Sequence, residues 1–264
     1  MPPQPESSLH FVRPTVVLLD LDDTLFDHAN TARATLTVST AGIPEFQGVD
    51  LEALYQQYSE ILEEMHPQVL AGRYSYEEAR RLRFQRLLAP YGLGTTDAEA
   101  EQFAHRHYGY YQRLRRAVPG ALPLLKALKP HHRIGIVTNN RTSEQKEKLV
   151  QLGMAHLVDA LITSEDVGVT KPNPRIYQVA LECLHCSPAE AVMVGDNWLA
   201  DVVGALEAGI RPVWLNRFGG TRALTHVDEI TSLEPLAEVL LKITGPVSLP
   251  AGENAASPTK NNFQ

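Results

Sequence analysis

Short apolar runs alternate with helical patterns along most of the chain. Runs of this kind, with little charge before their last residue, are typical of strands covered on both faces of a parallel sheet. They occur at residues 16–20, 134–138, 160–163, 191–195 and 212–216, and helical patterns occur at 121–129, 142–152, 174–184, 199–208 and 233–243. Strand and helix in alternation predict an α/β fold with a doubly wound, parallel-sheet (Rossmann-like) core. Thr142 and Gln145 have the spacing of a capping box at the start of one helix.

One long interval, residues 28–118, breaks this alternation. Its apolar residues recur at helical spacing, as in Leu54, Tyr58, Ile61 and Met65. The interval therefore predicts an all-helical cap domain of about four helices, inserted between residues 13–27 and 119–244 of the α/β core. Residues 1–12 and 245–264 lack periodicity and are expected to be disordered.

Acidic residues follow the first strand directly, in the stretch VVLLDLDDTLFDH that begins at Val16. Ligands of open α/β sheets bind beyond the carboxyl ends of the strands, so the residues at those ends are candidates for a site. They are Asp20, Asp22 and Thr24 after the first strand, Thr138 and Asn139 after the second, Lys171 and Pro172 after the third, and Asp196, Asn197 and Asp201 after the fourth. Converging carboxylates repel one another unless they bind a cation or share a proton, and Mg²⁺ suits such oxygen ligands.

The acidic loop alone also fits two simpler interpretations. A solvated turn would be rich in aspartate for its own reasons. A calcium loop starting at Asp20 would require Gly at the sixth position and Glu at the twelfth, where this chain has Leu25 and Thr31. The calcium pattern is therefore absent. The residues that follow the other three strands are what distinguish a functional site from a solvated turn.

In this order and on these elements, the four pieces resemble the four motifs of the haloacid dehalogenase superfamily of phosphatases, and the insertion resembles that superfamily's cap. The resemblance covers about residues 16 to 215. It implies that Asp20 is the nucleophile that forms an aspartyl phosphate and that Asp22 is the general acid and base. It further implies roles for the remaining residues: Thr138 and Asn139 would donate to the phosphoryl group, Lys171 would neutralise charge, and Mg²⁺ would be bound by Asp20, the backbone carbonyl of Asp22 and Asp196, with Asp201 in its outer shell. Asp23 and Asp27 are expected to be structural or solvating.

The predicted function is that of a Mg²⁺-dependent phosphomonoester hydrolase for a small phosphorylated metabolite, of the nucleotide, sugar phosphate or phosphoglycolate type. A haloacid dehalogenase would not need Asp22, whereas a phosphomutase would keep all four motifs and differ only in its product. A non-catalytic regulatory or binding protein could also retain the fold.

The insertion contains eight of the nine tyrosines. It also contains a group of arginines: Arg73, Arg80, Arg81, Arg83 and Arg86. Tyrosine and arginine together can stack on a base or hold an anionic tail, although helix packing explains the same residues. Arg73 and Tyr74 follow Gly72 in an expected interhelical loop, and we predict that they bind substrate.

The composition of the chain restricts the partners and the cellular compartment that we expect. The net charge of −7, without a basic block, argues against a nucleic-acid partner. No apolar run approaches a membrane span, no signal peptide is evident, and the two cysteines, Cys183 and Cys186, cannot form a disulfide framework. Their CxxC spacing is more typical here of helix packing than of a redox or zinc site. We therefore expect a cytoplasmic protein, either a monomer or a small homo-oligomer.

Overall fold

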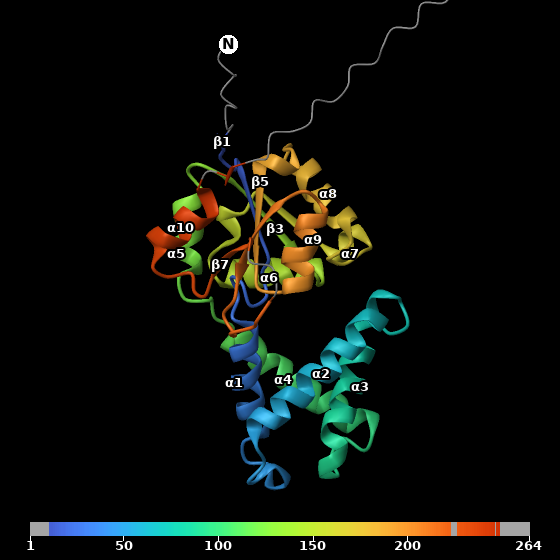
Figure 1. Cartoon of the computed structure of the whole chain (residues 1–264). Helices are drawn as coiled ribbons and strands as arrows, with labels where there is room; N and C mark the ends of the chain where they lie inside the picture. The colour runs from blue at the N-terminus through green and yellow to red at the C-terminus, as the bar shows by residue number, and fades with distance from the viewer. Residues whose placement is uncertain (1–10, 223–225, 246, 249–264) are drawn as a thin grey trace, which may run out of the picture.

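A six-stranded, wholly parallel sheet forms the centre of the molecule in the computed structural model, which describes residues 11–222, 226–245 and 247–248 (Figure 1). The strand order is β4-β3-β2-β5-β6-β7. The strands are β2 (Val16–Leu19), β3 (Arg133–Thr138), β4 (Ala160–Thr163), β5 (Ala191–Gly195), β6 (Arg211–Leu215) and β7 (Asp228–Ile230). The predicted doubly wound sheet is confirmed. Strand β7 was not predicted, because it has three residues and two of them are charged.

Helices cover both faces of this sheet. They are α5 (Ala121–Leu128), α6 (Thr142–Gln151), α7 (Ser164–Val167), α8 (Pro174–Cys183), α9 (Gly204–Glu207) and α10 (Leu236–Thr244), with a π-helical segment at Trp198–Val203 and 3-10 turns at Ala155–Leu157 and Pro188–Glu190. Val17 and Leu19 of β2 pack in one hydrophobic cluster with residues of α5, α6 and α10, whereas Val16 and Leu18 pack in another with residues of α8 and α9. Successive side chains of a strand point to opposite faces, so an uninterrupted apolar run serves both clusters.

Two local predictions about these helices were wrong. The segment expected as one helix at 199–208 is divided into the π-helical segment and α9. Helix α6 begins after Arg141 without a side-chain cap, so Thr142 and Gln145 do not form a capping box. The Gln145 amide instead reaches the carboxyl ends of the strands, where it donates hydrogen bonds to Asp22 and Thr138.

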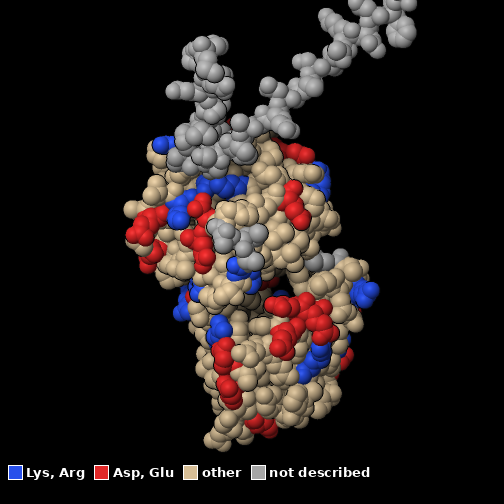
Figure 2. All heavy atoms as spheres, in the orientation of Figure 1, with Lys and Arg blue, Asp and Glu red and all other residues tan. Residues whose placement is uncertain are grey.

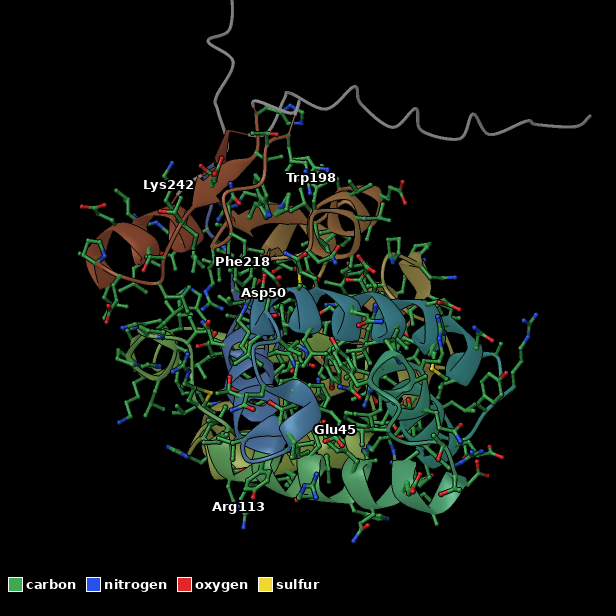
Figure 3. The ribbon with its side chains drawn as sticks, turned by 90° about the horizontal axis from the view of Figure 1, so that it is seen from below. Glu45, Asp50, Arg113, Trp198, Phe218 and Lys242 are labelled. Carbon is green, nitrogen blue, oxygen red and sulfur yellow. The ribbon has the colours of Figure 1, made fainter. Side chains whose placement is uncertain are left out.

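The helical insertion contains four α-helices, as predicted, and lies against the carboxyl ends of the strands. They are α1 (His28–Thr40), α2 (Leu51–Leu70), α3 (Tyr76–Leu88) and α4 (Asp97–Leu114), with 3-10 turns at Pro44–Phe46 and Ala89–Tyr91. Helices α3 and α4 each begin with a complete capping box. Seen from the helical side, α2 runs across the molecule from its N-cap Asp50, in front of the sheet (Figure 3). The aromatic centre of the insertion is formed by Tyr58, Phe84, Phe103 and His107.

The two linkers between the sheet and the insertion are joined to each other. Phe26 forms an antiparallel bridge with Ala117, and the Asp27 amide donates to the Arg116 carbonyl at 3.0 Å. The buried carboxylate of Asp27 accepts hydrogen bonds from Arg116 and Arg217, both at 2.9 Å. These contacts agree with the structural role expected for Asp27, because they attach the linkers to the sheet domain.

The first and last described residues lie on the side of the sheet away from the insertion (Figure 1). Strand β1 (Phe11–Val12) pairs antiparallel with β8 (Val247–Ser248), within segments for which no structure was expected. The rest of those expected disordered segments, 1–10, 246 and 249–264, lies outside the described residues. Among the described helices, none is both long and apolar enough to span a bilayer.

Candidate active site

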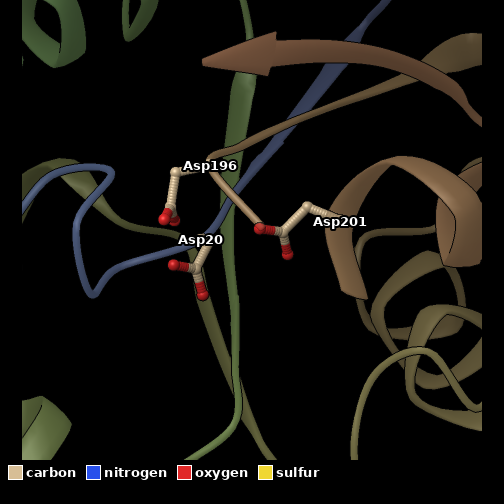
Figure 4. Close-up of side chains that lie close together, drawn as sticks. All are labelled: Asp20, Asp196 and Asp201. Atoms are coloured by element: carbon tan, nitrogen blue, oxygen red, sulfur yellow. The ribbon is translucent and has the colours of Figure 1, made fainter. Parts of the chain in front are cut away.

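Three aspartates form the centre of the candidate site, two of them at neighbouring strand ends and the third on the segment that follows (Figure 4). Asp20 follows β2 and Asp196 follows β5, the adjacent pair at which the strand order reverses, and Asp201 projects from the π-helical segment. One carboxylate oxygen of each residue lies within 4.8 Å of those of the other two. The switch point of a doubly wound sheet is where ligands of such folds bind. The structure therefore brings these three predicted residues together.

Lys171 supplies a positive charge inside this cluster. Its ammonium group donates to Asp20 at 2.7 Å and to Asp201 at 2.6 Å, and all three side chains are at least nine-tenths buried. Asn139 holds the lysine backbone: its side-chain oxygen accepts from the Lys171 amide at 2.8 Å, and its side-chain nitrogen donates to the Lys171 carbonyl at 3.0 Å. In this structure the Asn139 side chain therefore positions Lys171, a contact that the sequence did not predict.

Negative charge exceeds positive charge in this buried cluster. Burial raises the pKa of Asp20 to about 7, even though the Lys171 charge lowers it, and the Asp201 and Asp22 charges raise it further. Burial and the charges of Asp20 and Asp201 also hold the pKa of Asp196 well above its usual range. Burial alone would lower the pKa of Lys171, but Asp20 and Asp201 raise it above its ordinary value. The lysine thus stays charged, and the carboxylates still lack one or more positive charges.

A small divalent cation fits this donor set. The oxygens of Asp201 are engaged by the Lys171 ammonium and, at 3.0 Å, by the Asn197 amide. The Asp196 carboxylate accepts a weaker hydrogen bond, from the Thr24 hydroxyl at 3.3 Å. Asp20 and Asp196 are therefore the carboxylates best able to bind a metal, with Asp201 behind them. Hard oxygen ligands of this kind suit Mg²⁺.

Gly195 allows Asp201 to approach this closely. A Cβ atom at position 195 would lie 2.3 Å from the Asp201 carboxyl carbon, closer than two non-bonded atoms can approach. A glycine that ends a central strand, just before an acidic residue, is thus required by the geometry of the cluster. The indole of Trp214, on the next strand, donates to the Asp196 backbone carbonyl at 2.9 Å and holds the following loop.

Asp22, two residues after Asp20, belongs to a separate set of hydrogen bonds. Its carboxylate accepts from the buried ammonium of Lys148 at 2.6 Å, from Gln145 at 3.1 Å and from Asn140 at 3.3 Å. Burial would raise the pKa of Asp22, but the charge of Lys148, the neighbouring His28 and the hydrogen bonds from Lys148 and Gln145 lower it to about 2. In this arrangement Asp22 is an ionised carboxylate.

Lys148 and Gln145 were missed as functional residues. Both lie on α6, where residues three apart share one face of the helix. Both are fully buried polar side chains. A polar pair at this spacing, on the helix that follows the second motif strand, was the available signal, but Gln145 was assigned to a capping box with Thr142. Thr138, a predicted donor, is buried beside them and accepts from Gln145 at 2.7 Å, which leaves its own hydroxyl hydrogen free to donate.

A cavity of about 450 Å³ lies between the helical insertion and the strand ends. The space-filling view shows the surface hollowed between the two parts (Figure 2). Its sheet-side lining consists of Asp22, Asn139, Asn140, Glu144, Lys148 and Asn197, and the rest comes from the insertion. Arg73 and Tyr74 do not line it: Arg73 is exposed in the turn after α2, and Tyr74 packs against the hydrophobic core. The structure therefore does not bring these two predicted residues to the site, because their turn lies beyond the cavity wall.

Fold and site together define an α/β enzyme with a carboxylate cluster beneath a helical insertion. Residues 14–209 match the haloacid dehalogenase-like hydrolase family. A glyceraldehyde 3-phosphate phosphatase of Methanothermobacter thermautotrophicus is 34% identical over 239 residues, which cover 84% of this chain and 96% of the relative. A phosphoserine phosphatase of Thermus thermophilus is 31% identical over 220 residues, covering 76% and 88%. The chain belongs to the haloacid dehalogenase-like hydrolases, and the predicted family, fold and enzyme class are confirmed.

A solved structure supports the fold independently. The HAD-hydrolase YfnB from Bacillus subtilis, whose structure contains magnesium, superimposes with a TM-score of 0.68 at 24% identity, and the match covers 86% of this chain and 99% of that one. At this identity the likeness concerns the fold, including the helical insertion between the first two central strands.

Proposed function

We propose that this chain is a Mg²⁺-dependent phosphomonoester hydrolase that acts on a small phosphorylated metabolite. The observation that carries the proposal is the buried cluster of Asp20, Lys171, Asp196 and Asp201, together with Asp22, which follows Asp20 by two residues and lines the neighbouring cavity. Curated relatives that are phosphatases of glyceraldehyde 3-phosphate and phosphoserine support the substrate class. Residues 28–118 would act as the cap domain over a core made of 13–27 and 119–244.

The nucleophile in this proposal is Asp20. One carboxylate oxygen of Asp20 would attack phosphorus as the bond from phosphorus to the leaving oxygen breaks. Lys171 would hold the nucleophile and offset the phosphoryl charge, and the Thr138 hydroxyl would donate to a phosphoryl oxygen. Mg²⁺, bound by Asp20, Asp196 and the Asp22 backbone carbonyl, would neutralise the charge shared by substrate and carboxylates.

Asp22 would transfer the protons. It would give a proton to the leaving oxygen and then take one from the water that attacks the aspartyl phosphate, releasing inorganic phosphate. Its bonds to Lys148, Gln145 and Asn140 hold it ionised, in the form of a base. To act as the acid it must first leave Lys148 and gain a proton, so substrate binding would be coupled to a rotation of this side chain.

Rival activities make different demands on the same residues. A dehalogenase would have no use for a second carboxylate, yet three donors position Asp22 here. A phosphomutase would return the phosphoryl group to a sugar instead of releasing it. A non-catalytic binding protein would have no need to keep a buried carboxylate cluster in which negative charge exceeds positive charge, because such a cluster destabilises a fold.

The test is hydrolysis of p-nitrophenyl phosphate by the purified protein, with Mg²⁺ and after EDTA. We expect activity with Mg²⁺, none after chelation, and none in Asp20→Asn, while the exposed charge-removal control Glu238→Gln stays active. Asp22→Asn mixed with substrate should carry a phosphoryl group on the peptide containing Asp20, as seen by mass spectrometry. Full activity in EDTA or in Asp20→Asn would contradict the mechanism, and transfer of phosphate to a sugar would favour a mutase.

A further inference from the structure

Two arginines of the helical insertion face the cavity without a carboxylate partner. Arg80 and Arg83 lie three residues apart on one face of α3, line the cavity and are half-buried. Neither forms an ion pair with any carboxylate in the described part of the chain. By contrast, Arg33, Arg81 and Arg86 of the same insertion pair with Glu52, Asp97 and Glu64 respectively. Arg80 and Arg83 are thus uncompensated cations in a partly desolvated wall, where an anion would stabilise them.

Each of these guanidinium groups is held in place by a tyrosine ring. Arg80 stacks over Tyr108 at 4.1 Å from the ring centre, and Arg83 over Tyr58 at 4.9 Å. Stacking occupies the flat face of a guanidinium and leaves its N–H edge available. The Nε atom of Arg83 is buried and has no hydrogen-bond partner among the described residues. The tyrosine faces are therefore already covered, whereas donors remain free.

His107 adds a third donor beside the arginines. It is 3% exposed, and its Nδ1 atom lies 3.1 Å from the Ser39 hydroxyl, while its Nε2 atom is buried without a partner in the described structure. Burial and the neighbouring charges of Arg83 and Arg80 lower the pKa of His107 to about 3. The ring is thus neutral at pH 7. In the tautomer in which the Ser39 hydroxyl donates to Nδ1, the Nε2–H group is a donor beside the two arginines.

We propose that Arg80, Arg83 and His107 form a subsite for a second anionic group, so that the substrate is a small phosphomonoester with a carboxylate or a further phosphate at its other end. This inference rests on the proposed phosphatase function and narrows its substrate class. Carboxylate and phosphate oxygens both match the edge of a guanidinium. A nucleoside is disfavoured because each tyrosine that lines the cavity already has an arginine over one face of its ring: Tyr58, Tyr76, Tyr108 and Tyr111. The cavity of about 450 Å³ is large enough for a metabolite of this kind.

The test compares matched substrates in steady-state kinetics. Wild type should hydrolyse 3-phosphoglycerate with kcat/KM at least about tenfold above glycerol 3-phosphate, which has a hydroxymethyl group in place of the carboxylate. Fructose 1,6-bisphosphate against fructose 6-phosphate distinguishes a second phosphate from a carboxylate, and UMP represents nucleotides. In Arg80→Met and Arg83→Met the preference for 3-phosphoglycerate over glycerol 3-phosphate should disappear, mainly because the KM for 3-phosphoglycerate rises. Arg73→Met, an exposed arginine outside the cavity, should retain it.

Two readouts separate the possible failures. If wild type does not hydrolyse p-nitrophenyl phosphate or any other ester, the proposed function itself is contradicted. If it hydrolyses p-nitrophenyl phosphate but treats the matched pairs alike or prefers UMP, only the anionic subsite is contradicted. Glycerate should inhibit wild type competitively and Arg83→Met at least about tenfold less, whereas equal inhibition overturns the subsite. Should the Met variants fail to fold, Arg83→Lys, which keeps the charge but loses the planar fork, should show an intermediate preference.

Discussion

Replacing Lys171 by methionine should destabilise the protein far more than removal of an ordinary lysine. The Lys171 ammonium contacts Asp20 at 2.7 Å and Asp201 at 2.6 Å, and the side chains of the three residues are 3%, 9% and 1% exposed. Methionine fills a similar volume but leaves both carboxylates buried without their counter-charge. Breaking a buried ion pair in this way costs about 3–5 kcal/mol, a large part of a typical unfolding free energy of about 5–15 kcal/mol.

The matched control is Lys129→Met. Lys129 pairs with Asp159 at 2.5 Å, but both side chains are about one-third exposed, and such surface pairs contribute about 0–1 kcal/mol. Urea unfolding followed by circular dichroism, at pH 8 in EDTA, measures both variants on the same scale. Equal losses would refute the reasoning, because they would mean that water reaches the Asp20 cluster as freely as it reaches Asp159.

The unfolding free energy lost in Lys171→Met should also depend on pH, in a direction set by the raised pKa of Asp20. The pKa of Asp20 is raised to about 7 in the folded protein, from an ordinary value of 3.8. A group with a raised folded pKa favours the folded state fully below its ordinary pKa, and this contribution is lost as the pH rises through the folded value. Removal of Lys171 raises the folded pKa further. The variant should therefore be less impaired at pH 5 than at pH 8, and a larger loss at pH 5 would contradict this assignment.

Three further outcomes follow from the same site. The pKa of Asp22 is lowered from 3.8 to about 2, so its ionised form stabilises the fold above about pH 4. This contribution, about 2 kcal/mol, is lost as the pH falls toward 2. In acid unfolding curves, Lys148→Met should lose most of that pH dependence. Gly195→Ala places a Cβ atom against Asp201 and should cost about 1–3 kcal/mol and most of the phosphatase activity, measured by urea unfolding and p-nitrophenyl phosphate turnover. Mg²⁺ at a hundred times its Kd should stabilise wild type by about 2.7 kcal/mol in urea unfolding, and Asp196→Asn should lose this gain.

Controls for these outcomes exist within the chain. Gly109 lies in α4 with open space around its Cβ position, so Gly109→Ala should leave activity unchanged and stabilise the helix by about 0.5–1 kcal/mol. Acid unfolding curves of Lys148→Met and wild type that run parallel from pH 5 to pH 2 would mean that Lys148 does not lower the pKa of Asp22. If Mg²⁺ raised the unfolding free energy of Asp196→Asn as much as that of wild type, the cation would bind elsewhere.

The sequence by itself determined the sheet and the strand ends. Buried parallel strands are continuous apolar runs, so the residue that ends each strand can be identified from the sequence. Asp20, Thr138 and Asp196 could therefore be placed at the carboxyl edge of the sheet without coordinates. The helical insertion was equally evident from its 3.6-residue period. Lys171 and Asp201 lie further from the strand ends, on a loop and on the π-helical segment, and the resemblance carried by the four motifs gave them their expected roles.

Only the tertiary structure decided which polar side chains meet across elements. Gln145 has the spacing of a cap, yet it turns to Asp22 and Thr138, because the packing of α6 against the sheet offers it better partners than its own helix end. Arg73 and Arg80 are similar residues a few positions apart, and only the docking of α3 over the strand ends places Arg80 at the cavity and leaves Arg73 in solvent. Periodicity tells which face of a helix is apolar but not which surface it will meet, since that depends on contacts between residues far apart in the chain.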